Sequence, residues 1–175
     1  MLKEITGLFI TISAFWHVLA FAYGIVFIHL SLKSIFRQIE YDNRWSKIIR
    51  TADLHLWLSG IAIILLGIYD KGLALYISNP KLWCKVTVVV IWLVSSKLMH
   101  KYGIPELIKG NAKPMINFCS VNLSCWIYGA ILGCAKPLAY GVVTYPNFIS
   151  GFLILNLIVF LILNYFRNLK SKASS

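Results

Sequence analysis

The stretch from Arg50 to Lys85 decides the fold and reads R-T-A-D-L-H-L-W-L-S-G-I-A-I-I-L-L-G-I-Y-D-K-G-L-A-L-Y-I-S-N-P-K-L-W-C-K. It opens with ionisable groups at the edge of an apolar run. The chain then turns through a polar loop from Asp70 to Pro80 and re-enters apolar sequence that carries Lys85. Because a bilayer-spanning helix needs roughly 20 apolar residues, the stretch predicts two membrane helices joined by a short turn.

The composition of the whole chain also indicates a membrane protein. Of its 175 residues, 59% are hydrophobic and 13% are charged, whereas soluble domains usually contain about 45–50% apolar residues. We therefore expect an all-α polytopic membrane helix bundle that forms a single domain over residues 1–175. A four-helix core and a peripheral, lipid-facing C-terminal helix are predicted. The expected spans are Ile5–Leu32, Thr51–Tyr69, Leu82–Met99, Met115–Ala135 and Pro146–Phe166.

The net charge of +11 arises from basic residues that segregate to alternate loops. If the spans alternate, twelve of the seventeen Lys and Arg residues share one side, which the positive-inside rule places in the cytoplasm. The N-terminus is then outside a bacterial plasma membrane, and the first span is retained. Such loops serve topology and anionic lipid headgroups, so no nucleic-acid partner is expected. The twelve residues are Lys33, Arg37, Arg44, Lys47, Arg50, Lys97, Lys101, Lys109, Lys113, Arg167, Lys170 and Lys172.

Ionisable residues inside the spans are costly in hydrocarbon, so each is a candidate functional group or a paired structural group. His17 lies near mid-span on a stripe of small residues, which places it against protein and requires a hydrogen-bond partner or a metal. Asp53 has two interpretations: it caps its helix, or it pairs with Arg50 or handles protons. Lys85 either serves a site or snorkels to the outer surface. The stripe consists of Ser13, His17, Ala20 and Gly24.

The remaining histidines and the cysteines give weaker signals. His29, His55 and His100 all fall toward the predicted cytoplasmic ends of their spans. A metal site among them, with His55 as the weaker metal candidate, is one interpretation, and interfacial histidines satisfied by water are the simpler one. The cysteines show no C-x-x-C spacing and are interpreted as packing residues. They are Cys84, Cys119, Cys125 and Cys134.

The pattern R-x-A-D-L, an apolar span ending in glycine, and K-G-x-x-x-Y-x-x-N-P-x-x-W-x-K resembles a family of small uncharacterised bacterial membrane proteins. This family is a domain of unknown function. The later L-A-Y-G-V at Leu138–Val142 is similar to that family's sequence after its fourth span. The resemblance covers Ser13 to about Val142. The matching residues are His17, Arg50, Ala52, Asp53, Leu54, Gly67, Lys71, Gly72, Tyr76, Asn79, Pro80, Trp83 and Lys85.

More distantly, a first-span histidine with a Trp-x-Lys opening of the third span resembles the HemJ-type protoporphyrinogen IX oxidase. The overall helix plan is similar to the CopD-type copper-resistance membrane proteins. The HemJ resemblance implies haem b ligated by His17 and Lys85, a tetrapyrrole substrate and electrons passed to quinone. Asp53 and Arg50 then become a polar pair for propionates or protons. A neutral imidazole is a standard haem ligand, and a lysine nitrogen binds iron only when it is deprotonated.

Two other functions remain open from the sequence. One is the handling or transport of copper or another metal across the membrane, and the other is a non-catalytic membrane assembly subunit. A homo-oligomer is compatible with all three functions. A Soret band would favour haem, bound metal without colour would favour transport, and the absence of both would favour the assembly subunit.

Overall fold

The computed structural model describes residues 2–36, 39–42, 44–135, 138 and 141–173. All regular elements in this part of the chain are helical, which confirms the predicted all-α bundle. Arg37, Lys136 and the Ala139–Tyr140 pair of the L-A-Y-G-V match lie outside the described residues. Five segments are long and apolar enough to cross a membrane: Glu4–Ile35, Lys47–Lys71, Pro80–Ile108, Lys113–Cys134 and Tyr145–Leu169.

The helices divide between two compact units. The first unit comprises Met1–Leu30 and Asp42–Asn79, and the second comprises Ser31–Tyr41 and Pro80–Ser175. The predicted single domain with a four-helix core therefore stays a prediction. In chain order the elements are α1 (Leu2–Ile35), α2 (Trp45–Lys71), α3 (Leu73–Ile77), α4 (Pro80–Leu98), η1 (Met99–Gly103), α5 (Ile104–Ile108), α6 (Lys113–Cys134) and α7 (Tyr145–Ala173).

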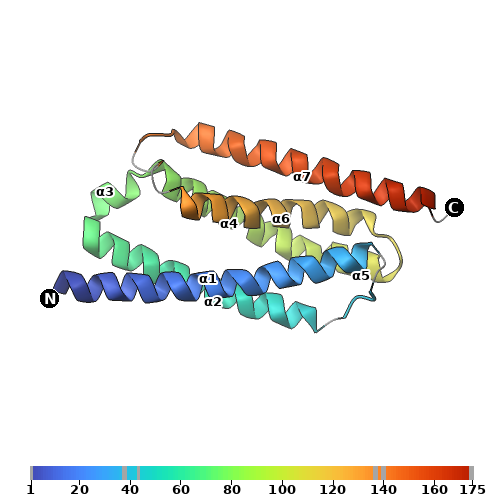
Figure 1. Ribbon diagram of the computed structural model, residues 1–175, viewed down its shortest axis with the longest axis horizontal. Helices are drawn as coiled ribbons and strands as arrows, with labels where there is room; N and C mark the ends of the chain where they lie inside the picture. The colour runs from blue at the N-terminus through green and yellow to red at the C-terminus, as the bar shows by residue number, and fades with distance from the viewer. Residues whose placement is uncertain (1, 37–38, 43, 136–137, 139–140, 174–175) are drawn as a thin grey trace. The chain divides into compact units, whose positions relative to one another are not determined.

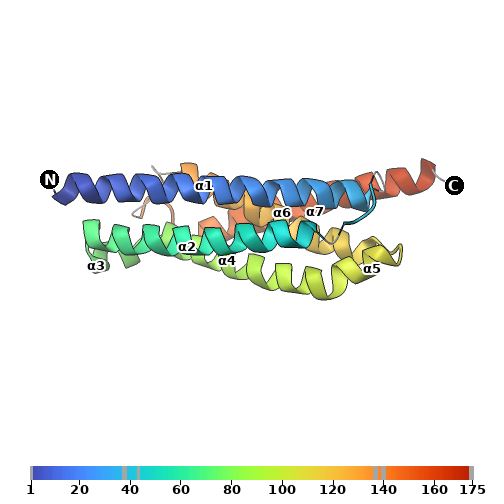
Figure 2. The same ribbon diagram turned by 90° about the horizontal axis from the view of Figure 1, so that it is seen from below.

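In the first unit, α1 and α2 run antiparallel, and α3 follows the end of α2 (Figures 1 and 2). Neither long helix contains a proline, so each continues without a break. At the end of α2 the chain turns at Gly72, whose φ of 81° is a conformation that glycine adopts without strain. Its N–H donates to the carbonyl of Ile68 at 2.8 Å. The predicted polar loop from Asp70 to Pro80 therefore contains a short helix.

The second unit is built on α4, α6 and α7, which pack against one another. The hydroxyl of Tyr128 in α6 donates to the carbonyl of Phe148 in α7, and its ring packs against Phe152 at a centroid distance of 5.6 Å. Most of the large apolar side chains of α7 are exposed, as expected for a helix that faces lipid. The buried apolar residues of these three helices are Cys84, Val88, Trp92, Met115, Ile116, Cys119, Cys125, Trp126, Tyr128, Leu132, Phe148, Phe152, Val159 and Leu163.

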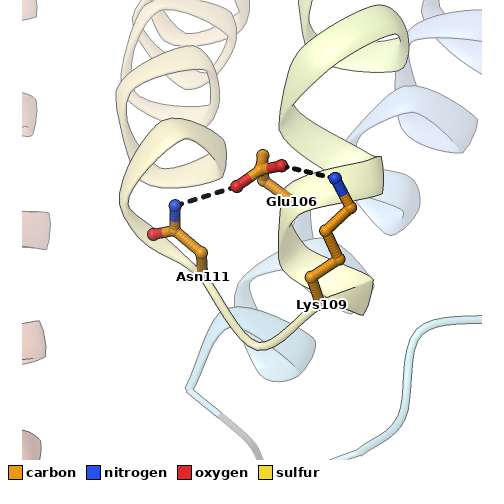
Figure 3. Close-up of polar contacts among 3 residues, drawn as sticks. All are labelled: Glu106, Lys109 and Asn111. Carbon is orange, nitrogen blue, oxygen red and sulfur yellow. Dashed lines mark hydrogen bonds and ion pairs between the residues drawn. The ribbon is translucent and has the colours of Figure 1, made fainter.

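The connection between α4 and α6 is compact. The π-helical turn η1 follows α4, and Pro105 lies in the first turn of α5. The chain then reverses at Gly110, with a φ of 91°. Glu106 organises the turn, because its two carboxylate oxygens accept hydrogen bonds from Lys109 Nζ at 2.9 Å and Asn111 Nδ2 at 3.0 Å (Figure 3). These contacts are exposed, so they shape the turn more than they stabilise the fold.

Candidate functional site

His17 lies on a buried stripe of α1, as its sequence spacing predicts. Ser13, Ala20 and Gly24 are buried, whereas Val18 on another face of the same helix is exposed. His17 itself is half-buried. The small residues around it leave room beside the ring for another chain segment, because residues three and four apart share one helix face. The predicted protein-facing position of His17 is confirmed.

One hydrogen-bond partner of His17 in the first unit is Ser59 of α2. Nδ1 of His17 lies 2.9 Å from Oγ of Ser59, and the same Oγ lies 2.6 Å from the carbonyl oxygen of His55. A carbonyl has no hydrogen to donate, so the Ser59 hydroxyl must donate to His55. With its single hydrogen used, Ser59 can only accept from His17. The Nδ1 atom is therefore protonated, and in the neutral ring the lone pair lies on Nε2.

Two further contacts between α1 and α2 lie beside this hydrogen bond. Gly60 follows Ser59, and a Cβ at that position would lie only 3.7 Å from Cε1 of His17, so the ring rests against the helix backbone. One residue before His17, the Trp16 ring lies 5.7 Å from the ring of His55, tilted by 59°. Nδ1 of His55 is buried and has no hydrogen-bond partner among the described residues. The ring of His17 is thus oriented by α2, while His55 retains an unused polar atom.

Asp53 does not cap α2. The helix begins at Trp45 with Arg44 as its N-cap residue, and only the first four backbone N–H groups of a helix lack an internal partner. Asp53 lies more than two turns further along, so the capping interpretation is wrong. Its Oδ1 atom is buried and accepts no hydrogen bond from a described residue, and Arg50 is exposed one turn earlier. The use of these two residues as a polar pair stays a prediction.

Lys85 lies in the second unit, half-buried on α4. One turn earlier, Lys81 is only 7% exposed, and its Nζ donates to the carbonyl of Ala135 at the C-terminal end of α6 at 2.7 Å. A cation at that end of a helix is favourable because the free carbonyls and the helix dipole are negative there. Lys85 forms no hydrogen bond with the described residues. His17 and Lys85 belong to different units, so their pairing as haem ligands stays a prediction.

The histidine cluster receives no support from the structure. His29 is exposed. Among the residues that the structure describes, no three His, Cys, Asp or Glu side chains come together in a way that could hold a metal ion. His55 therefore lacks the companions that a protein-only metal site would require. Haem differs in this respect, because its iron needs only axial ligands from the protein.

Ser59 and Lys81 were not recognised as site residues from the sequence. Ser59 lies one turn after His55, so the spacing places both residues on one face of the helix. The spacing does not reveal that His17 of α1 contacts this face. Lys81 follows the Asn79-Pro80 pair, which marks the start of α4 and places Lys81 in its first turn. Its acceptor, the Ala135 carbonyl, is 54 positions away and left no signal in the sequence.

Comparison of the chain with protein-family models, with curated proteins and with solved structures finds no match.

Proposed function

We propose that the protein is a membrane redox protein that holds haem b through His17. The observation that carries the proposal is the hydrogen bond from Nδ1 of His17 to Ser59, whose own hydrogen goes to the His55 carbonyl. This arrangement leaves the lone pair of the neutral ring on Nε2. Histidines that ligate metals usually donate their other ring N–H in this way, which fixes both the tautomer and the ring orientation.

Lys85 is the second residue that would hold the haem in this proposal. It lies inside a membrane-spanning helix and uses no hydrogen-bond acceptor among the described residues. Lys81 already donates to the Ala135 carbonyl at the C-terminal end of α6. A carbonyl at a helix end is the group that a lysine on this face of α4 would otherwise bind. The assignment of Lys85 rests on the resemblance to HemJ-type oxidases.

Bound haem would supply a one-electron couple, and the protein would supply ligands, orientation and a site that excludes water. In this proposal the guanidinium of Arg50 would bind a propionate of the haem, since its planar fork suits carboxylates. The buried Oδ1 of Asp53 accepts a proton. The substrate class is a tetrapyrrole and the electron acceptor a quinone. The protein would act in the bacterial plasma membrane with its N-terminus outside.

The test is the absorption spectrum and haem content of protein purified from haem-supplied cells. Wild type should show a Soret band that His17→Ala abolishes, while the variant still inserts because insertion depends on span hydrophobicity and loop charge. His29→Ala is the matched control, since His29 lies on the same helix but is exposed. Equal haem content in wild type and His17→Ala would sink the assignment.

The same preparation separates the other functions. Copper or another metal bound without a Soret band would point to metal handling. A protein that binds neither haem nor metal would point to an assembly subunit.

A further inference from the structure

The short helix α3 leaves large apolar side chains uncovered. Leu73, Leu75 and Ile77 are 58%, 52% and 44% exposed, and none of the five residues of α3 is buried. Exposed apolar surface of this kind is unfavourable in water and marks a contact with lipid or another molecule. A helix of five residues is also too short to be stable by itself in water. The contacts within the chain therefore leave this apolar surface uncovered.

A tyrosine ties α3 to the end of α2. The ring of Tyr76 occupies the place where a side chain at Gly67 would be. A Cβ there would clash with Cε2 of Tyr76 and would lie 2.9 Å from Cζ. The backbone N–H of Tyr76 also donates to the carbonyl of Gly72 at 3.1 Å. With Tyr76 half-buried against α2, the other large side chains of α3 remain exposed.

An exposed apolar stripe of α2 ends close to the start of α3. Leu58, Ile61, Leu65 and Tyr69 are all exposed, and their spacing places them on one face of a membrane-spanning helix. Such a face contacts lipid chains. Leu73 begins four residues after the last of them. Polar residues flank the apolar helix, namely Asp70 and Lys71 before it and Ser78 and Asn79 after it.

We propose that α3 lies in the membrane interface, with Leu73, Leu75 and Ile77 among the acyl chains of the leaflet at the C-terminal end of α2. Lipid is the occupant because α3 directly follows a membrane-spanning helix whose exposed side chains are apolar, and because polar residues border α3 on both sides. Short apolar segments with polar flanks bind in this way at the boundary between headgroups and acyl chains. The connection after α2 is then a membrane-embedded element and not an aqueous loop.

Spin labels test this placement in phospholipid bilayer discs. The background is Cys134→Ser, because Cys134 is the exposed thiol and the other three cysteines are buried. One label is attached at Leu75→Cys, and the matched control label is attached at Ser78→Cys, which is exposed at the polar end of α3. Collision with oxygen reports lipid, and collision with a water-soluble nickel chelate reports water.

The label at residue 75 should collide mainly with oxygen, and the label at residue 78 mainly with the nickel chelate. Predominant nickel collisions at residue 75 would overturn the proposal by placing α3 in water. Low collision rates with both reagents would overturn it as well, because they would mean that protein, such as a second copy of this chain, covers the surface.

A second variant tests the anchor. Gly67→Ala puts a methyl group where the Tyr76 ring lies, so the oxygen preference of the label at residue 75 should be lost or reduced. Gly7→Ala is the control, because a Cβ at Gly7 would meet nothing within 4 Å. An unchanged oxygen preference in Gly67→Ala would remove the anchoring role of Tyr76.

Discussion

His17 in α1 and Ser59 in α2 are joined by a hydrogen bond of 2.9 Å, although they are 42 positions apart in the chain. Both residues lie in the first unit. A polar contact between membrane helices is worth about 0.6 kcal/mol on average and about 1.7 kcal/mol at most. The bond therefore matters less for the stability of the helix pair than for fixing the register of α1 on α2 and the orientation of the imidazole.

Ser59→Ala should weaken haem binding without preventing insertion. The variant removes the acceptor for Nδ1–H of His17, so the ring loses its fixed tautomer and orientation. Loss of such a supporting hydrogen bond typically lowers metal affinity about 10–100-fold. The measurement is a titration of the apoprotein with haem, followed by the Soret absorbance.

Thr11→Val is the control for this experiment. Its exposed hydroxyl donates to the carbonyl of Gly7 within α1. The control should bind haem as wild type does. Equal affinities of Ser59→Ala and wild type would show that Ser59 does not position His17.

Lys85→Met should retain haem but shift its spectrum if Lys85 is an axial ligand. The thioether sulfur of methionine also ligates haem iron, yet it changes the energies of the iron orbitals. Lys97→Met is the matched control, because Lys97 is an exposed lysine of the same helix. Identical spectra of Lys85→Met and wild type would indicate that Lys85 snorkels to the surface.

The positions of the helices follow from local sequence, which explains why they were predictable. A run of about 20 apolar residues favours a spanning helix wherever it occurs. Pro80 starts α4, as its position after Asn79 indicates. The buried stripe of Ser13, His17 and Ala20 follows from 3.6 residues per turn.

The contacts between segments required information that no local pattern contains. His17 lies on the small-residue stripe of α1, and Ser59 lies on the same face of α2 as His55. Which residues of the two faces meet depends on how the two long helices pack. The start of α2 was placed at Thr51 because the preceding residues are polar, whereas the helix begins at Trp45. That shift of six residues changed the interpretation of Asp53. Helix α3 was missed because five residues are too few to show a period.

Asn122→Ala should destabilise the second unit. The Asn122 amide is buried between helices, where Nδ2 donates to Oγ of Ser95 at 2.9 Å and to the carbonyl of Phe118 at 2.8 Å. Its loss should lower the free energy of unfolding by about 1 kcal/mol. The measurement is unfolding in mixed detergent micelles. Asn117→Ala, an exposed asparagine of the same helix, should cost less, and equal losses would show that the Asn122 bonds contribute nothing specific.

The termini should lie on opposite sides of the membrane. Five segments can span it, and an odd number of spans places the two ends apart. Twelve basic residues share one side, whereas Lys3, Lys71, Lys81 and Lys136 fall on the other and Lys85 lies within a span. The larger group should be cytoplasmic because Lys and Arg near span ends resist translocation. A reporter fused after Ser175 should therefore report cytoplasm, and one fused before Met1 should report the outside.

The internal turns provide a check that does not depend on the ends. A small tag inserted at Gly110, next to the Glu106–Lys109 contact, should be protected from externally added protease, whereas the same tag at Ser78, the polar end of α3, should be cleaved. Both residues are exposed, so each should tolerate an insertion. Cleavage at Gly110 together with protection at Ser78 would invert the orientation. Termini found on the same side would rule out five spans.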